Sequence, residues 1–323
     1  MARLPNVIVP GAQKSGTTTL ARLLALHPDC ALARPKEPGF FCRARELREP
    51  ERYARAFAHV GSERAVVDAS TAYMADPAIP ARARQHLGPD VRAIFILRDP
   101  ASRALSAYWH LAKRGAERRS PVEVFRFDGP DLRAAVAQEA CRLGPARARG
   151  RIDPSEFAER YDDALWPFRY LANGRYLEPI RRWREVFGRE RVLVLLLEEL
   201  AADPEGVFAR VTTFLGLEPA LPREALGAVH NRTRIPRRGP LARGLRRLGE
   251  RPALRRLRAR APRLARWYEG ALYAPRPASD RALEARLRAL YAPDQLPLAS
   301  ELGVDLAAWW GAPGAGSRAH SAA

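Results

Sequence analysis

The segment VIVPGAQKSGTTTL, residues 7–20, decides the fold. Its β-branched start predicts a strand over 7–9, and leucines at helical spacing after Thr17 predict a helix. Between them, Gly11 and Gly16 permit the backbone angles of a tight loop. Such a turn brings backbone N–H groups and the positive end of a helix dipole to one point. With Lys14 in the loop, the segment predicts a phosphate-binding site.

The loop differs from a Walker A motif, which requires a lysine directly after the second glycine. Here Thr17 follows Gly16, and the lysine lies inside the loop. The chain has 55 Lys+Arg, but its only lysines are Lys14, Lys36 and Lys113. A lysine retained among so many arginines indicates a position that requires a compact ammonium group. A glycine-rich turn without a ligand is the alternative interpretation of the loop alone.

The length of 323 residues suits one large domain. We expect a single domain over 1–310 and a disordered Gly/Ala/Ser-rich tail over 311–323. The net charge of +19 would suit nucleic acid, an anionic membrane or an acidic substrate, although an arginine-rich composition alone gives the same count. The short N-terminus and the lack of a long apolar run predict a cytoplasmic protein without an integral membrane segment. The three cysteines, Cys30, Cys42 and Cys141, have no metal-ligand spacing, so we expect structural free thiols and no metal.

Strands and helices alternate along the chain. Strands are expected over 65–68, 92–97 and 192–197, and helices over 77–87, from Pro100 onward, over 170–187 and over 205–215, the last closed by Gly216. This alternation predicts an α/β, P-loop-like three-layer fold with a central, mostly parallel sheet covered by helices. Residues 113–154 show no clear pattern. The stretch 231–266 is strongly basic with leucines at helical spacing, and predicts a basic helical C-terminal segment.

A second anion motif follows the strand over 92–97. Arg98 at the strand end and Ser106 on the next helix can converge on one phosphate, the first as a fork donor and the second as a hydroxyl. The competing interpretation takes Asp99 as a Walker B acid that holds Mg²⁺. It is weakened because the loop lacks the expected metal partner, and an Asp before Pro100 is more simply a helix cap.

The two motifs together resemble the 5′-phosphosulfate loop and the 3′-phosphate segment of sulfotransferases that use 3′-phosphoadenosine 5′-phosphosulfate (PAPS). The resemblance continues through Gly174-Arg175-Tyr176, Glu198-Glu199-Leu200 and Asn231-Arg232-Thr233, covers most of residues 5–310, and is closest to the glycan and heparan-sulfate-type branch. It implies PAPS as the donor and 3′,5′-adenosine bisphosphate as a product. The cofactor-binding residues that it implies are Gln13, Lys14, Ser15, Gly16, Thr17, Thr18, Arg98 and Ser106, with Arg234, Arg237 and Arg238 on a loop that closes over the cofactor.

Catalytic residues also follow from the resemblance. The segment KEPGFF, residues 36–41, matches the family's Lys-Glu-x-x-Phe-Phe pattern, which implies Glu37 as the base, with Lys14 on the electrophilic side. The alternative for Glu37 is an exposed carboxylate paired with Lys36 or Arg34. His27 and His110 stay alternatives for the base, because histidine suits that role at neutral pH. The expected substrate residues are Lys36, Asp68, Ser70 and Tyr73.

Two departures from the family pattern concern the acceptor. Gly39 stands where glycan members often carry a histidine, and Ala69 stands where members that act on acidic glycans often carry a lysine. Both argue against a heparan-like acceptor.

The favoured function is therefore sulfuryl transfer to a hydroxyl or amine of a carbohydrate, glycolipid or small metabolite, with no nucleic acid as a partner. The first alternative is a small-molecule kinase or NTPase with a degenerate P-loop. The second is a basic nucleic-acid-binding protein, for which the sequence has no helix-turn-helix, zinc-finger or aromatic stacking signature.

Overall fold

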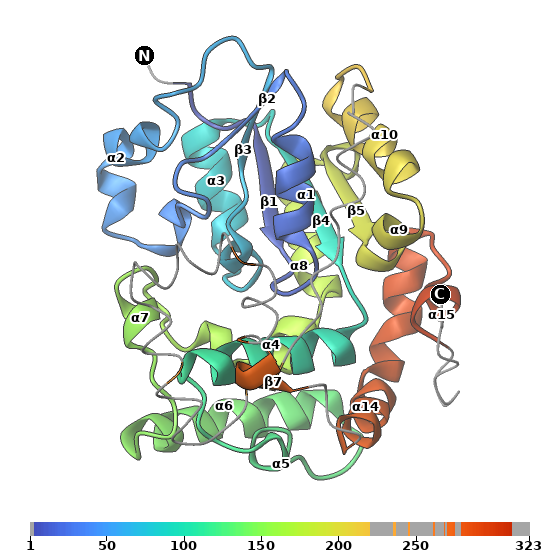
Figure 1. Ribbon diagram of the computed structural model, residues 1–323. Coiled ribbons are helices and arrows are strands. Elements are labelled where there is room, and N and C mark those ends of the chain that lie inside the picture. Colours follow the sequence, from blue (N-terminus) through green and yellow to red (C-terminus); the bar gives the residue numbers. More distant parts are fainter. Residues whose placement is uncertain are drawn as a thin grey trace.

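The computed structural model describes residues 3–219, 235–236, 245, 261, 268, 270–274 and 279–311. Its centre is a five-stranded parallel sheet in the order β2-β3-β1-β4-β5 (Figure 1). The strands are β1 (Val7–Gly11), β2 (Cys30–Leu32), β3 (Ala65–Asp68), β4 (Arg92–Leu97) and β5 (Val192–Leu196). The predicted α/β class and parallel sheet are confirmed.

Helices cover both faces of this sheet, and successive side chains of each strand point to opposite faces. Ile8 and Phe95 pack with Ile180 and Trp183, toward α3 (Ile79–Leu87) and α8 (Leu177–Phe187). Val7, Val9, Ile94 and Ile96 pack on the other face toward α1 (Thr17–Leu24), α9 (Leu197–Ala202) and α10 (Pro204–Leu215). Burial on both faces explains the near-continuous apolar runs of β1 and β4.

A helical layer lies across the carboxyl end of the sheet (Figure 1). It contains α4 (Pro100–Arg114), α5 (Pro121–Val124), α6 (Leu132–Ala148) and α7 (Ser155–Ala158), with α14 (Ser279–Leu302) and α15 (Leu306–Trp310) beside it. Its apolar core is separate from those on the sheet faces and includes Leu105, Tyr108, Phe125, Tyr170 and Leu287. The remaining helix α2 (Pro50–Arg55) lies near the β2 edge, and β6 (Ile235–Pro236) pairs antiparallel with β7 (Tyr273–Ala274). Short 3₁₀ helices occupy Phe40–Cys42, Glu46–Arg48, Thr71–Met74, Trp166–Phe168, Ala172–Gly174 and Arg189–Arg191.

Most predicted elements are present. The helix expected over 170–187 begins only at Leu177. The sequence also missed α6, a helix of 17 residues inside the stretch with no clear pattern, because the positions it buries include Glu139 and the small residues Ala135 and Ala146. Such positions carry little apolar periodicity.

The cysteines differ in exposure. Cys30 and Cys42 are buried, Cys141 is exposed, and all three are free thiols. Within the described ranges, no helix is long and apolar enough to cross a membrane, and no group of three or more His, Cys, Asp or Glu residues could hold a metal ion. Apart from Ile235, Pro236, Leu245 and Ala261, the basic stretch 231–266 lies outside the described residues, as do Arg234, Arg237, Arg238 and the tail beyond Gly311.

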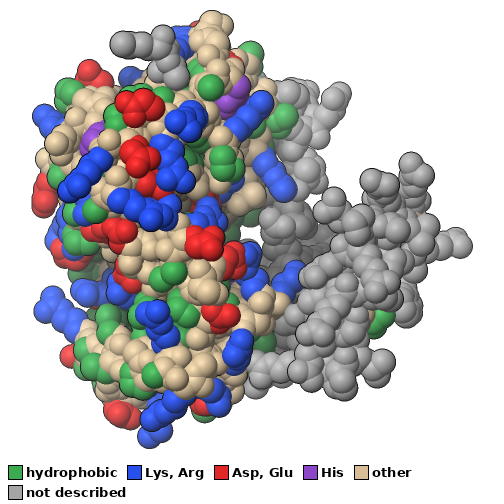
Figure 2. Space-filling view, turned by 90° about the vertical axis from the view of Figure 1, so that its left-hand side faces the viewer, with side chains coloured by type: hydrophobic (Ala, Val, Ile, Leu, Met, Phe, Trp, Pro, Cys, Tyr) green, Lys and Arg blue, Asp and Glu red, His purple; other side chains and the backbone are tan. Residues whose placement is uncertain are grey.

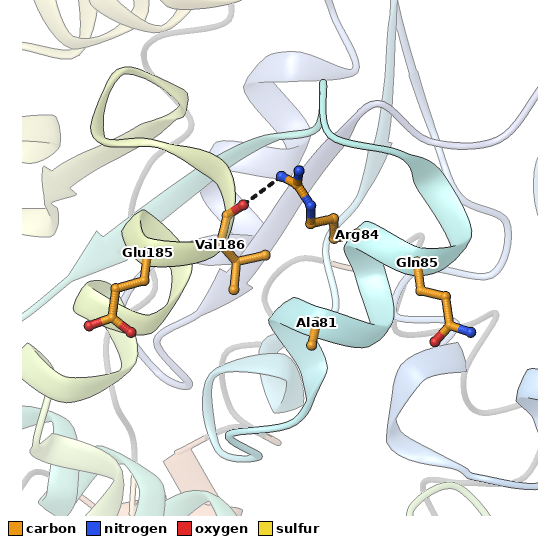
Figure 3. Close-up of a pocket in the computed structure, with 5 residues that line it drawn as sticks. All are labelled: Ala81, Arg84, Gln85, Glu185 and Val186. Carbon is orange, nitrogen blue, oxygen red and sulfur yellow. Dashed lines mark hydrogen bonds between the residues drawn. The ribbon is translucent and has the colours of Figure 1, made fainter.

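A hollow between α3 and α8 is lined by Ala81, Arg84, Gln85, Glu185 and Val186 (Figure 3). Arg84 Nη1 donates a hydrogen bond of 2.8 Å to the carbonyl oxygen of Val186, so this arginine ties the two helices together. Arg84, which lines the hollow, therefore has a structural role.

Candidate functional site

A cleft of about 820 Å³ lies between the loop after β1 and the face of α4. Residues from both predicted anion motifs line it: Gln13, Lys14, Gly16, Thr17, Thr18, Arg98 and Ser106. Lys36 and Glu37 line the same cleft. We call the part formed by residues 13–18, Arg98 and Ser106 the loop side, and the part formed by Lys36, Glu37, Thr71 and residues 156–166 the Glu37 side.

The loop after β1 has the backbone that its glycines predict. Gly16 has φ +96° and precedes the first residue of α1. A Cβ there would lie 2.6 Å from the terminal methyl of Leu197, which would have to move, and the positive dihedral angle itself favours glycine. Lys14 also has a positive φ, +66°. Ser15 is fully buried and does not line the cleft.

The loop side is strongly positive. The pKa of Lys14 is lowered mainly by burial and further by Arg98, Lys113 and Arg114, with Glu37 opposing. Burial also lowers the pKa of Arg98, whose Nη1 lies 3.5 Å from the carbonyl oxygen of Lys14. Among the ion pairs of the described residues, none includes Lys14 or Arg98. A bound anion would offset this uncompensated charge.

The position of Arg98 is set by contacts from distant parts of the chain. Tyr176 donates its hydroxyl hydrogen to the carbonyl oxygen of Arg98 at 2.9 Å. The next residue, Asp99, caps α4 by accepting from the Ser102 N–H at 2.6 Å, and its second oxygen accepts from Arg288 Nε at 3.0 Å. Both carboxylate oxygens are therefore engaged, which confirms the helix-cap interpretation.

Glu37 lies across the cleft from the loop. Its carboxylate is 25% exposed, pairs with Lys36 Nζ at 2.7 Å and lies 3.4 Å from the Thr71 hydroxyl. Arg160 holds the backbone by donating to the Glu37 carbonyl oxygen at 3.1 Å, and Glu37 itself has φ +60°. The ion pair with Lys36 that the alternative interpretation expected is present. It lies in the cleft, where Glu37 also interacts electrostatically with Lys14.

Asp68, Ser70 and Tyr73, the other expected substrate residues, are buried and do not line the cleft, so the geometry does not place them in contact with an acceptor. These three residues are at most 1% exposed. Asp68 is the centre of the buried hydrogen-bond network that joins them. Its Oδ2 accepts from Tyr53 and Tyr73, both at 2.8 Å, and its Oδ1 accepts from Ser70 at 2.6 Å. The Ser70 hydroxyl accepts in turn from the Gly39 N–H at 3.0 Å. The network therefore supports the Glu37 loop from below.

The two histidines differ in position. His27 is buried outside the cleft, with Nε2 at 2.7 Å from the Glu218 carbonyl oxygen and Nδ1 accepting from the Asp29 N–H. It is a structural residue. His110 lines the cleft, and burial together with Lys14, Arg114 and Lys113 lowers its pKa to about 4, so its imidazole is neutral at pH 7.

Sequence reasoning missed much of the cleft wall. Trp109, Lys113 and Arg114 line it from α4, and a second group follows α6: Glu156, Phe157, Arg160, Tyr161 and Trp166. The first group had a usable signal, because residues 106, 109, 110, 113 and 114 share one helix face at helical spacing. The second group had none, since it comes from an irregular stretch that reaches Glu37 only through tertiary contacts.

Comparison with known proteins identifies the family. The family model described as "Sulfotransferase domain" matches residues 4–235. The chain belongs to the sulfotransferase family. The part of the match that is described includes both anion motifs and the Glu37 loop.

Individual relatives agree with this assignment. The sulfotransferase is 27% identical over 216 residues to the human heparan sulfate glucosamine 3-O-sulfotransferase 6, covering 67% of this chain and 53% of that protein. It is 25% identical over 226 residues to the Caenorhabditis elegans bifunctional heparan sulfate N-deacetylase/N-sulfotransferase 1, covering 68% of this chain and 23% of that one. The chain thus spans about half or less of these curated relatives. A crystal structure of a sulfotransferase from Alicyclobacillus acidocaldarius superposes with a TM-score of 0.63 at 27% identity, covering 96% of this chain and 99% of that chain.

Proposed function

We propose that the chain transfers the sulfuryl group of PAPS to a hydroxyl or amine of a carbohydrate, glycolipid or small-metabolite acceptor, and the similarity to heparan sulfate sulfotransferases favours a carbohydrate among these. The observation that carries the proposal is the composition of this cleft. Two half-buried cations that have no carboxylate partner among the described residues, Lys14 and Arg98, stand on one side, and the carboxylate of Glu37 stands on the other.

The loop side suits a nucleotide that carries two separate anionic groups. Lys14, the hydroxyls of Thr17 and Thr18 and the start of α1 are assigned to the phosphosulfate, and Arg98 and Ser106 to the 3′-phosphate. An anion here would offset the burial and the repulsion from Arg98 that together lower the pKa of Lys14. Arg234, Arg237 and Arg238 remain proposed cofactor contacts outside the described residues.

The donor supplies the sulfuryl group, and the residues of the chain supply acid–base and electrostatic catalysis. Glu37 accepts the proton of the attacking hydroxyl, which requires an ionised carboxylate within hydrogen-bond reach of that hydroxyl. Lys36 and Thr71 orient that carboxylate through the contacts described above. Lys14 stabilises the negative charge that develops on the leaving phosphate. His110 is the alternative base, since its neutral imidazole lines the same cleft.

The kinase alternative fits less well because both oxygens of Asp99, the candidate metal ligand, already accept hydrogen bonds from Ser102 and Arg288. Nucleotide selectivity tests the choice. We expect 3′,5′-adenosine bisphosphate to raise the unfolding temperature without Mg²⁺, more than adenosine 5′-phosphate does. Transfer of labelled sulfate from PAPS to a sugar panel then tests the reaction. Stabilisation by ATP with Mg²⁺ but not by the bisphosphate would contradict the proposal.

A further inference from the structure

The turn that carries Arg98 is held by side chains from α9 and α15. Glu198, in the first turn of α9, accepts a hydrogen bond from the Asp99 N–H through Oε1 at 3.2 Å. Its Oε2 accepts from Trp310 Nε1, also at 3.2 Å. Trp310 is the last residue of α15, which lies beside α9 (Figure 1). Both oxygens of Glu198 are therefore engaged, one by the turn and one by the C-terminal helix.

Trp310 reaches the same turn by a second contact. Its indole packs edge to face on Tyr176, with ring centroids 6.2 Å apart. Tyr176 donates its hydroxyl hydrogen to the carbonyl oxygen of Arg98. The Arg98 carbonyl and the Asp99 N–H belong to one planar trans peptide group, so they point in opposite directions. Tyr176 and Glu198 therefore hold this peptide group from both sides, and Trp310 contacts both of them.

The contacts of Trp310 are buried. Trp310 is 3% exposed and Tyr176 is 2% exposed, and both belong to the apolar core that also includes Leu298 and Leu306 from the C-terminal helices. A hydrogen bond that is shielded from water is stronger than one on the surface, so it fixes its partners more firmly. Trp310 lies beyond residue 235, where the match to the family model ends. The C-terminal helices therefore support the Arg98 turn from outside the matched part of the chain.

The position of Arg98 decides how well it binds a 3′-phosphate. A guanidinium makes two parallel hydrogen bonds to a phosphate only when its plane is aligned with the oxygens. A shift of the backbone that carries Arg98 would therefore weaken both bonds. The surface seen in Figure 2 offers no substitute, because the described basic and acidic side chains are interspersed there and give an anion no concentrated positive field.

We propose that Trp310 is a positioning residue for the 3′-phosphate site. It does not line the cleft, and it acts through Glu198 and Tyr176, which hold the peptide group between Arg98 and Asp99. This inference rests on the proposed binding of PAPS. It adds a residue, distant in sequence and outside the cleft, that makes the chain selective for a nucleotide with a 3′-phosphate.

The variant Trp310→Phe keeps an aromatic ring against Tyr176 and removes the N–H that Glu198 accepts. In the full chain, calorimetry gives the ratio of the affinities for 3′,5′-adenosine bisphosphate and adenosine 5′-phosphate. We expect this ratio to fall about threefold to tenfold, because only the bisphosphate carries the group assigned to Arg98. Trp309→Phe is the matched control, since Trp309 is the neighbouring residue of the same helix but is 38% exposed. An unchanged ratio in Trp310→Phe, including one that results from equal losses for both nucleotides, or an equal fall in Trp309→Phe would overturn the inference.

A double-mutant cycle tests whether Trp310 acts through Glu198. Glu198→Gln keeps the size of the side chain but leaves one oxygen in place of the two that accept from Asp99 and Trp310, so it should lower the affinity ratio by itself. Trp310→Phe should then lower the ratio less in the Glu198→Gln background than in the unmodified chain. Additive effects of the two changes would overturn the inference. Failure of the unmodified chain to bind the bisphosphate more tightly than adenosine 5′-phosphate would instead overturn the proposed function.

Discussion

The buried carboxyl of Asp68 gives the sharpest test of how the core supports the site. It is fully buried and accepts hydrogen bonds from Tyr53, Tyr73 and Ser70. Burial is the main cause that raises its pKa from an ordinary value of 3.8 to about 6, against the opposing effect of those three donors. We therefore predict that Asp68→Asn changes the pH dependence of stability in a defined direction.

The sign follows from proton binding. Between pH 4 and pH 6 the folded protein holds a proton on Asp68 that the unfolded chain has released, so raising the pH across this window destabilises the fold. The rise from 3.8 to about 6 corresponds to about 3 kcal/mol. Because asparagine does not titrate, the free energy of unfolding of the wild type minus that of Asp68→Asn should fall by up to about 3 kcal/mol between pH 4 and pH 7.

Urea unfolding of both proteins across this pH range measures the difference directly, and it cancels titrations that the two proteins share. Asp128→Asn serves as a control, since it removes a carboxyl from an exposed position. A difference that is constant with pH, or that rises with pH, would refute the argument. A second readout concerns the site: Asp68 holds Ser70, which accepts from the Gly39 N–H, so Asp68→Asn should also lower turnover without weakening bisphosphate binding.

Three further predictions concern the cleft. Glu37→Gln should leave bisphosphate affinity nearly intact while turnover falls by roughly 10² to 10⁴; near-full turnover, with activity abolished in His110→Ala, would assign the base to the histidine. Lys14→Ala and Arg98→Ala should each weaken bisphosphate binding by about 1.5 to 3 kcal/mol, measured by calorimetry, whereas adenosine 5′-phosphate should be nearly insensitive to the Arg98 change; equal losses for both nucleotides would contradict the two-phosphate assignment. The pKa of Lys14 is lowered from its ordinary value of 10.5, and a bound anion would raise it. Bisphosphate affinity should therefore fall as the pH rises through that lowered pKa. An affinity that stays constant up to pH 10.5 would exclude this coupling between the protonation of Lys14 and bisphosphate binding.

The loop side of the cleft was predictable because its residues determine the backbone and the chemistry together. Gly16 is favoured by its positive dihedral angle, and the same turn brings Lys14 to the start of α1. Arg98 follows directly from the end of β4. Local sequence therefore specifies where these side chains lie, since parallel strands end at a common edge.

The Glu37 side was only partly predictable, because its contacts join residues far apart in the sequence. Arg160 meets the carbonyl oxygen of Glu37 across 123 positions of the chain, and no local pattern in residues 156–166 indicates that contact. The same limit applies to Asp68, which is the last residue of β3 but hydrogen-bonds Tyr53 and does not line the cleft. A strand end fixes the position of a residue more reliably than the direction of its side chain.

The helix α4 explains how the two sides act as one site. It begins at the Asp99 cap, carries Ser106 for the proposed phosphate, and within one further turn carries Trp109 and His110, which line the same cleft. Because these residues share one rigid helix, their spacing is set by helix geometry, which does not depend on a flexible loop. The C-terminal helix α14 fixes the start of α4 through the bond from Arg288 to Asp99, although it lies beyond the part of the chain that the family model matches. A change at Arg288 should therefore disturb all the proposed contacts that α4 carries together.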